Sequence, residues 1–275
     1  MLVLFESWKQ SLLLLHPKTL WVMLRSLKSH FFTTLLEIVH FLKWVFVVDG
    51  LIFLCFGQKL FIMLEQIAQK TQPMQKIPLV VTMIGIMVSV ITFLLHGAFL
   101  IVLRRQHSDL NKPLREYFGE FFMRYVQLAL FFSLIMVIFF SFIMSLGVTK
   151  IPTIPAWAPF LFGLVEMLIL FYWLDSTFTF KEVFASLEKG LNLFFYNLPL
   201  FLLILGLFFL GTKVTAHISH ILAPMSYEGV GVVSSGLYAV GIRYGKMMLD
   251  FGGTTFLFVI YQRRKQVLYN KIFSE

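Results

Sequence analysis

Long apolar runs separated by short polar segments dominate the chain. A helix needs about 20 mostly apolar residues to cross the hydrocarbon core of a bilayer, and six stretches meet that requirement. They lie at about 33–57, 79–103, 126–148, 157–174, 193–211 and within 229–261. The pattern therefore predicts an all-α, polytopic membrane protein with about six transmembrane helices.

Other segments carry apolar residues on one helical face only. Near the N-terminus Leu4, Trp8 and Leu12 share a face, and segments 114–125 and 180–191 show a similar periodicity. Amphipathic helices of this kind lie in the membrane interface. We therefore expect one integral membrane domain over residues 1–275. Its parts are N-terminal interfacial helices (1–32), a six-helix bundle (33–261) and a basic cytoplasmic tail (262–275).

Composition supports a lipid environment. The chain is 59% hydrophobic and 13% charged, whereas soluble domains are about 45–50% apolar and about 25% charged. The single cysteine, Cys55, excludes an internal disulfide framework and a cysteine metal cluster.

The net charge is +9, and the basic residues are distributed along the chain as the predicted topology requires. Lys and Arg concentrate in alternate loops and at both ends. The other three loops hold only Lys59, Lys70, Lys76, Lys150 and Lys213. Because basic loops stay in the cytoplasm, we expect a multi-pass inner-membrane protein with cytoplasmic N- and C-termini. The charge then belongs to membrane orientation, so we expect the lipid bilayer as a partner and no nucleic acid.

Two segments carry a family resemblance. They are "TFKEVFASLEKGLNLFFYNLPLFLLILGLFF" (179–209), with an asparagine at the entry to a span, and "TTFLFVIYQRRKQ" (254–266), with a tyrosine followed by arginines. This layout resembles bacterial six-helix inner-membrane proteins related to the membrane domain of glycerophosphodiester phosphodiesterases. The phosphodiesterase catalytic domain has no counterpart here, so the resemblance implies a membrane fold and transfers no catalytic residue.

Enzyme motifs are not evident. The chain has no HExxH, GxSxG, P-loop or CxxC pattern. His217 and His220 form an i,i+3 pair in a predicted outer loop, but a metal site needs further ligands. We therefore expect no cofactor, no metal and no catalytic residue.

Ionisable residues inside the predicted spans are the candidate site. Such residues usually face the bundle interior or a wet cavity. They are Asp49, His96, Glu166, Arg243, Lys246 and Asp250. Lys246 and Asp250 are spaced i,i+4 and can pair. Gly241 and Gly245 form a GxxxG motif that lets another helix approach closely. We predict an interior Lys246–Asp250 pair with Asp49 as a third member.

Three functions remain open from the sequence. The first is a non-enzymatic envelope or lipid-associated membrane protein, acting with a membrane-protein partner or as a homo-oligomer. The second is a transporter of a small solute, lipid or ion, with a polar path near Asp49, Glu166, Lys246 and Asp250. The third is a lipid-modifying membrane enzyme. An intramembrane charge pair can fix packing, line a pathway or take part in catalysis, so the pair does not choose among them.

Overall fold

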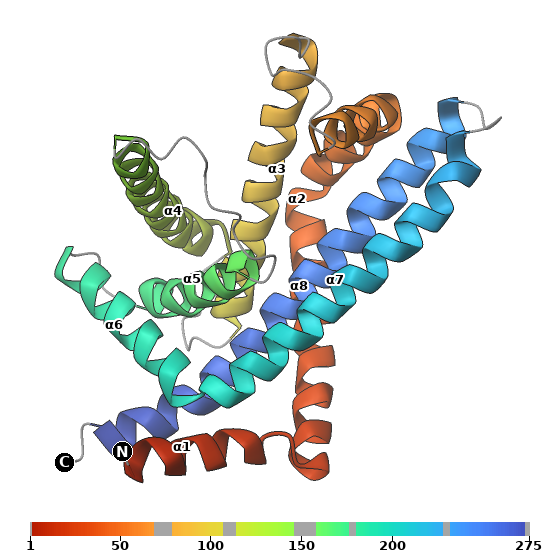
Figure 1. The fold of residues 1–275 in the computed structure, drawn as a ribbon. Coiled ribbons are helices and arrows are strands. Elements are labelled where there is room, and N and C mark those ends of the chain that lie inside the picture. The colour runs from red at the N-terminus through yellow and green to blue at the C-terminus, as the bar shows by residue number, and fades with distance from the viewer. Residues whose placement is uncertain are drawn as a thin grey trace.

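The computed structural model describes residues 2–68, 79–106, 114–145, 158–175, 180–227 and 232–272. Within these ranges the chain is helical and contains no strand, which confirms the all-α prediction. The helices are α1 (Leu2–Leu13), α2 (Pro17–Ala68), α3 (Leu79–Arg105), α4 (Leu114–Ser145), α5 (Ala158–Asp175), α6 (Phe180–Tyr196), α7 (Leu198–Tyr227) and α8 (Val232–Ile272) (Figure 1).

Membrane-spanning capacity is concentrated in the first half of the chain. In the described residues, three helices are long and apolar enough to cross a bilayer: Pro17–Gly57, Leu79–Arg105 and Leu114–Ile135. A bent pair, Glu182–Tyr196 with Leu198–Gly211, raises the number to four if it forms one span. These apolar helices indicate a membrane protein, and the further spans predicted from the sequence remain predictions.

Helix α2 is longer than the first predicted span. It runs from Pro17 to Ala68 with one non-helical residue, Leu42 (φ −109°, ψ 25°). Proline suits the first turn of a helix, and no glycine or proline follows before Gly50. The predicted boundary between 1–32 and 33–57 is therefore not a helix boundary.

The fifth predicted span, 193–211, contains a sharp bend. Asn197 separates α6 from α7, and the two helices meet at 83°. Pro199 lies in the first turn of α7, where its missing N–H costs nothing. In one continuous helix it would lie in the interior, where its ring would clash with the carbonyl of Phe195. Helix α7 continues to Tyr227, so His217 and His220 lie in a helix and the predicted loop there is wrong.

Close backbone contact joins α2 to α8. A Cβ atom added to Gly236 would lie 2.3 Å from the carbonyl oxygen of Leu54, and one added to Gly57 would lie 2.5 Å from the Cβ of Ala239. Small residues permit such an approach between helices in a membrane. Within the described part of the single chain no helix uses the GxxxG motif, because a Cβ on Gly241 or Gly245 would meet no atom within 4 Å.

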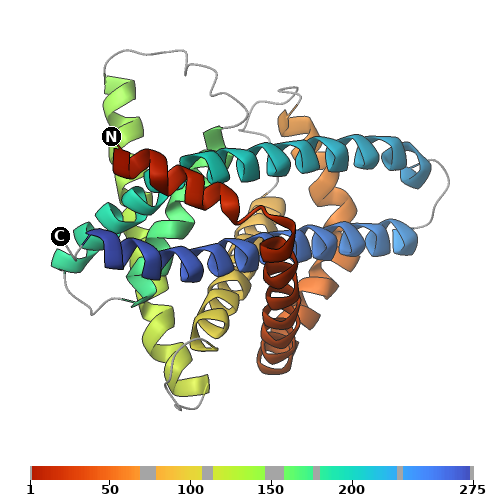
Figure 2. The same cartoon turned by 90° about the horizontal axis from the view of Figure 1, so that it is seen from below.

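Aromatic side chains fill the core around α8. Phe251 stacks on Phe99 of α3 with ring centroids 4.2 Å apart, and Phe258 meets Phe171 of α5 edge-on at 5.3 Å. All four are almost fully buried. These contacts, together with the close approach at Gly236, make α8 the element that connects α2, α3 and α5. Seen from below, α8 and α7 are two separate long helices (Figure 2).

Candidate functional site

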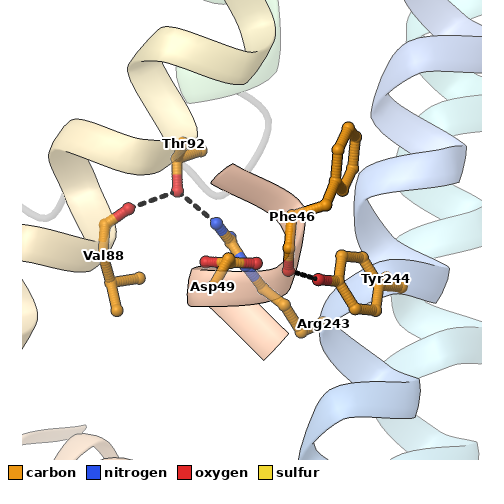
Figure 3. Close-up of polar contacts among 6 residues, drawn as sticks. All are labelled: Phe46, Asp49, Val88, Thr92, Arg243 and Tyr244. Atoms are coloured by element: carbon orange, nitrogen blue, oxygen red, sulfur yellow. Dashed lines mark hydrogen bonds and ion pairs between the residues drawn. The ribbon is translucent and has the colours of Figure 1, made fainter. Parts of the chain in front are cut away.

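A buried ion pair links α2 to α8. Asp49 is fully buried, and its Oδ2 lies 3.5 Å from Nε of Arg243, whose side chain is 15% exposed (Figure 3). The close contact at Gly57 and Gly236 brings these helices together. The pair thus joins a carboxylate and a guanidinium that lie far apart in the sequence.

Arg243 also reaches α3. Its Nη2 donates a hydrogen bond to Oγ1 of Thr92, and the Thr92 hydroxyl donates to the carbonyl oxygen of Val88 at 2.7 Å (Figure 3). The guanidinium carbon lies 5.3 Å from the centre of the Phe53 ring. One arginine side chain therefore holds three helices together through a charge, a hydroxyl and an aromatic face.

The neighbouring Tyr244 makes a second link between α8 and α2. Its hydroxyl donates to the carbonyl oxygen of Phe46 at 2.6 Å (Figure 3). A Cβ on Gly50 would lie 3.3 Å from that hydroxyl oxygen, so the glycine leaves room for it. Thr92 and Tyr244 were not predicted, because a single hydroxyl in an apolar helix gives no sequence signal.

Asp49 is only partly satisfied. Its Oδ1 is buried and has no hydrogen-bond partner among the described residues. Burying a carboxylate is costly unless its oxygens are paired. This oxygen is the chemically least satisfied atom of the Asp49–Arg243 site.

Lys246 and Asp250 lie elsewhere on α8. Both are exposed on the surface of the chain, and no ion pair joins them in the described structure. In the single chain these two residues do not face the interior as predicted, and Asp49 is paired with Arg243. The physical reason is that i,i+4 spacing puts two residues on one face of a helix but does not say which face turns inward.

The remaining two predicted residues are separate from this site. His96 on α3 is half-buried, its ring lies edge-on to Phe251 at 6.4 Å, and its Nε2 has no partner among the described residues. Glu166 on α5 lines an open cleft of about 530 Å³ between α3, α4 and α5. The six candidates therefore form no single continuous cluster.

A second polar cluster, here called the junction, consists of Ser7, Trp8, Asn197 and Arg264. Arg264 is 3% exposed; its Nε donates to Oδ1 of Asn197 at 2.5 Å and its Nη2 to Oγ of Ser7 at 3.0 Å. Asn197 Nδ2 donates to the carbonyl oxygen of Leu193 at 2.7 Å. Burial lowers the pKa of the Arg264 guanidinium, but arginine starts so far above neutral that it stays charged.

The junction fastens α1 to the bend between α6 and α7. The Ser7 hydroxyl donates to the carbonyl oxygen of Tyr196 at 3.0 Å, and Trp8 Nε1 donates to that of Phe195 at 2.9 Å. These carbonyls belong to the last turn of α6, which has no intrahelical donors left. Asn197 and Arg264 lie in the two segments that carried the family resemblance, but their pairing was not predicted.

Metal chemistry finds no support in the described residues, where no group of three or more His, Cys, Asp or Glu side chains gathers. Comparison of the chain with protein-family models, curated proteins and solved structures gave no match.

Proposed function

We propose that this chain is a multi-pass inner-membrane protein of non-enzymatic, lipid-associated type. The observation that carries the proposal is the exposed side of α1. This helix buries Ser7 and Ser11, which are 2% and 0% exposed, and exposes Phe5, Leu12 and Leu13 at 58%, 44% and 56%, together with Glu6 and Lys9. Large apolar side chains beside charged ones on one exposed surface are typical of a helix in the membrane interface, where the apolar groups enter the acyl boundary and the charges reach water.

The position of α1 supports the same proposal. It lies across the end of α2, a candidate span (Figure 1). A helix at that angle to a span lies along the membrane surface, where its apolar side enters the acyl boundary. Helix α6 meets the same junction and exposes Phe184 at 65%.

The contact between Ser7 and Arg264 bears on topology. It places α1 and the C-terminal part of α8 at the same end of the molecule (Figures 1 and 2). Both ends on one side of the bilayer require an even number of crossings. This supports the proposed cytoplasmic location of both termini, given the basic residues near them.

The exposed Lys246 and Asp250 support a protein partner. Charged side chains on a spanning helix are costly against acyl chains. A second membrane protein or another copy of this chain would cover them, and we propose such an assembly for the outer face of α8.

Spin labelling tests the lipid contact of α1. Cys55→Ser removes the native cysteine, and Leu12→Cys or Glu6→Cys, at opposite edges of the exposed side, then supplies one label in nanodiscs. The Leu12 label should collide with oxygen, which concentrates in lipid, and the Glu6 label with a water-soluble nickel chelate. Equal access of the nickel chelate to both labels would show that α1 does not lie in the interface.

Proton-coupled transport is the second candidate, favoured by the unsatisfied Oδ1 of Asp49 beside Arg243. A carboxylate that is buried and half-paired can take up a proton. Proteoliposomes under an imposed K⁺ diffusion potential would test it with a pH-sensitive dye. Proton flux that Asp49→Asn abolishes and Asp250→Asn preserves would support transport; flux unchanged by Asp49→Asn would exclude this route.

A further inference from the structure

The cleft between α3, α4 and α5 has the size of a ligand site. Its volume is about 530 Å³, within the roughly 300–1,000 Å³ range of small-molecule pockets. Its walls are mainly apolar and come from helices that are apolar along most of their length. Neither the Asp49–Arg243 site nor the junction contributes to it.

Glu166 gives the cleft its charge. Among the described residues that line it, this is the one ionisable acid or base apart from the Tyr125 phenol. No salt bridge or hydrogen bond joins Glu166 to another described residue. An unpaired carboxylate among apolar side chains is costly, and a cation beside it removes that cost.

Aromatic rings line the same cleft as this carboxylate. Phe93 and Tyr125 have ring centroids 4.6 Å apart, and Phe132 lines the same cleft. Aromatic faces attract organic cations, most strongly where water is excluded. Gly97 lets the Tyr125 ring pack on α3, because a Cβ there would lie 2.6 Å from Cδ1 of the ring.

The walls around Glu166 select the type of cation. The Glu166 side chain is exposed, and the cleft beside it is lined mainly by Phe93, Leu128, Phe132 and Leu170. A cation whose charge is covered by apolar substituents can contact these walls and the carboxylate at once, whereas a strongly hydrated cation would lose its water to apolar surface.

We propose that this cleft binds a lipophilic organic cation, with the positive centre against Glu166 and its apolar groups against Phe93, Tyr125 and Phe132. This goes beyond lipid association, since it assigns a ligand class to a site that the junction and α1 do not form. It stands even if the lipid-facing position of α1 is wrong.

Equilibrium binding of tetraphenylphosphonium to the purified full chain in nanodiscs tests the proposal. Wild type should bind the cation saturably, and triphenylphosphine oxide, which is neutral and similar in shape, should not compete. Glu166→Gln should weaken binding by about tenfold or more, the scale of one lost ion pair in a low-dielectric site. Phe132→Leu should weaken it by a smaller factor, of about three.

The matched control is Glu188→Gln, the same substitution at an exposed position of α6, which should bind as wild type does. Size-exclusion elution and the thermal midpoint confirm that each variant is folded. Unchanged affinity in Glu166→Gln, equal binding of the neutral oxide, or no saturable binding by wild type would each overturn the proposal. If Glu166→Gln does not fold, unchanged affinity in Phe132→Leu would overturn it in the same way.

Discussion

The carboxylate of Asp49 on α2 and the guanidinium of Arg243 on α8 lie 3.5 Å apart, with Asp49 fully inaccessible to solvent. Each side chain would be a buried or half-buried isolated charge without the other. Their contact and the hydrogen bond from Arg243 to Thr92 connect α2, α3 and α8 at one point.

Arg243→Gln should destabilise the protein more than the double variant Arg243→Gln/Asp49→Asn. Removing one partner of a buried pair leaves an uncompensated charge and costs about 3–5 kcal/mol, whereas neutralising both avoids that cost. Thermal unfolding of the detergent-solubilised variants measures the difference. Lys246→Gln and Asp250→Asn are the controls, and they should change the midpoint little in detergent that separates the chain from partners, because both residues are exposed in the single chain. If Asp250→Asn lowered the midpoint and adding Lys246→Gln restored it, the result would contradict the observed pairing.

Gly236→Ala should lower stability, and Gly241→Ala should not. A methyl group at position 236 would collide with the backbone of Leu54 at 2.3 Å, while position 241 has open space. Overpacking of this kind costs about 1–3 kcal/mol, and alanine is otherwise favoured over glycine in a helix. Folded yield and thermal midpoint of the two variants give the comparison. Similar losses in both would mean that α2 and α8 do not touch at Gly236.

Arg264→Lys should loosen α1 although the charge is kept. Lysine lacks the planar fork with which arginine bonds Asn197 and Ser7 at once. Backbone hydrogen exchange in residues 2–13 should therefore become faster, by about tenfold if roughly 1.4 kcal/mol of local stability is lost. Arg263→Lys is the neighbouring control and should leave α1 unchanged. Protection of α1 that is the same in both variants would show that the junction does not hold it.

Fusion reporters should show both the C-terminus in the cytoplasm and the 146–156 segment outside it. A reporter active only in the cytoplasm should be active after Glu275 and silent after Lys150, because basic residues concentrate on the cytoplasmic side of a six-span arrangement. Activity at both positions would be inconsistent with six spans and would require a different set of crossings.

The helical class and the approximate position of most helices were readable from the sequence. Apolar runs of about 20 residues form helices in lipid because every backbone N–H and C=O must then be satisfied within the segment. The bend at Asn197 and the unbroken start of α2 were missed. The bend depends on a single residue, Pro199, and the long start of α2 depends on the lack of glycine or proline between Pro17 and Gly50. A mean hydropathy taken over about 20 residues does not detect either feature.

The ionisable residues of the site were also visible in the sequence, but their partners were not. Spacing along α8 favours Lys246 with Asp250, since i,i+4 residues are neighbours on any helix. The structure pairs Arg243 with Asp49, at a separation of 194 residues. That choice depends on which face α8 turns toward α2, and the face is determined by where two backbones can approach, at Gly57 and Gly236. The sequence of one helix determines which residues share a face, whereas the packing of two helices determines which charged residues pair.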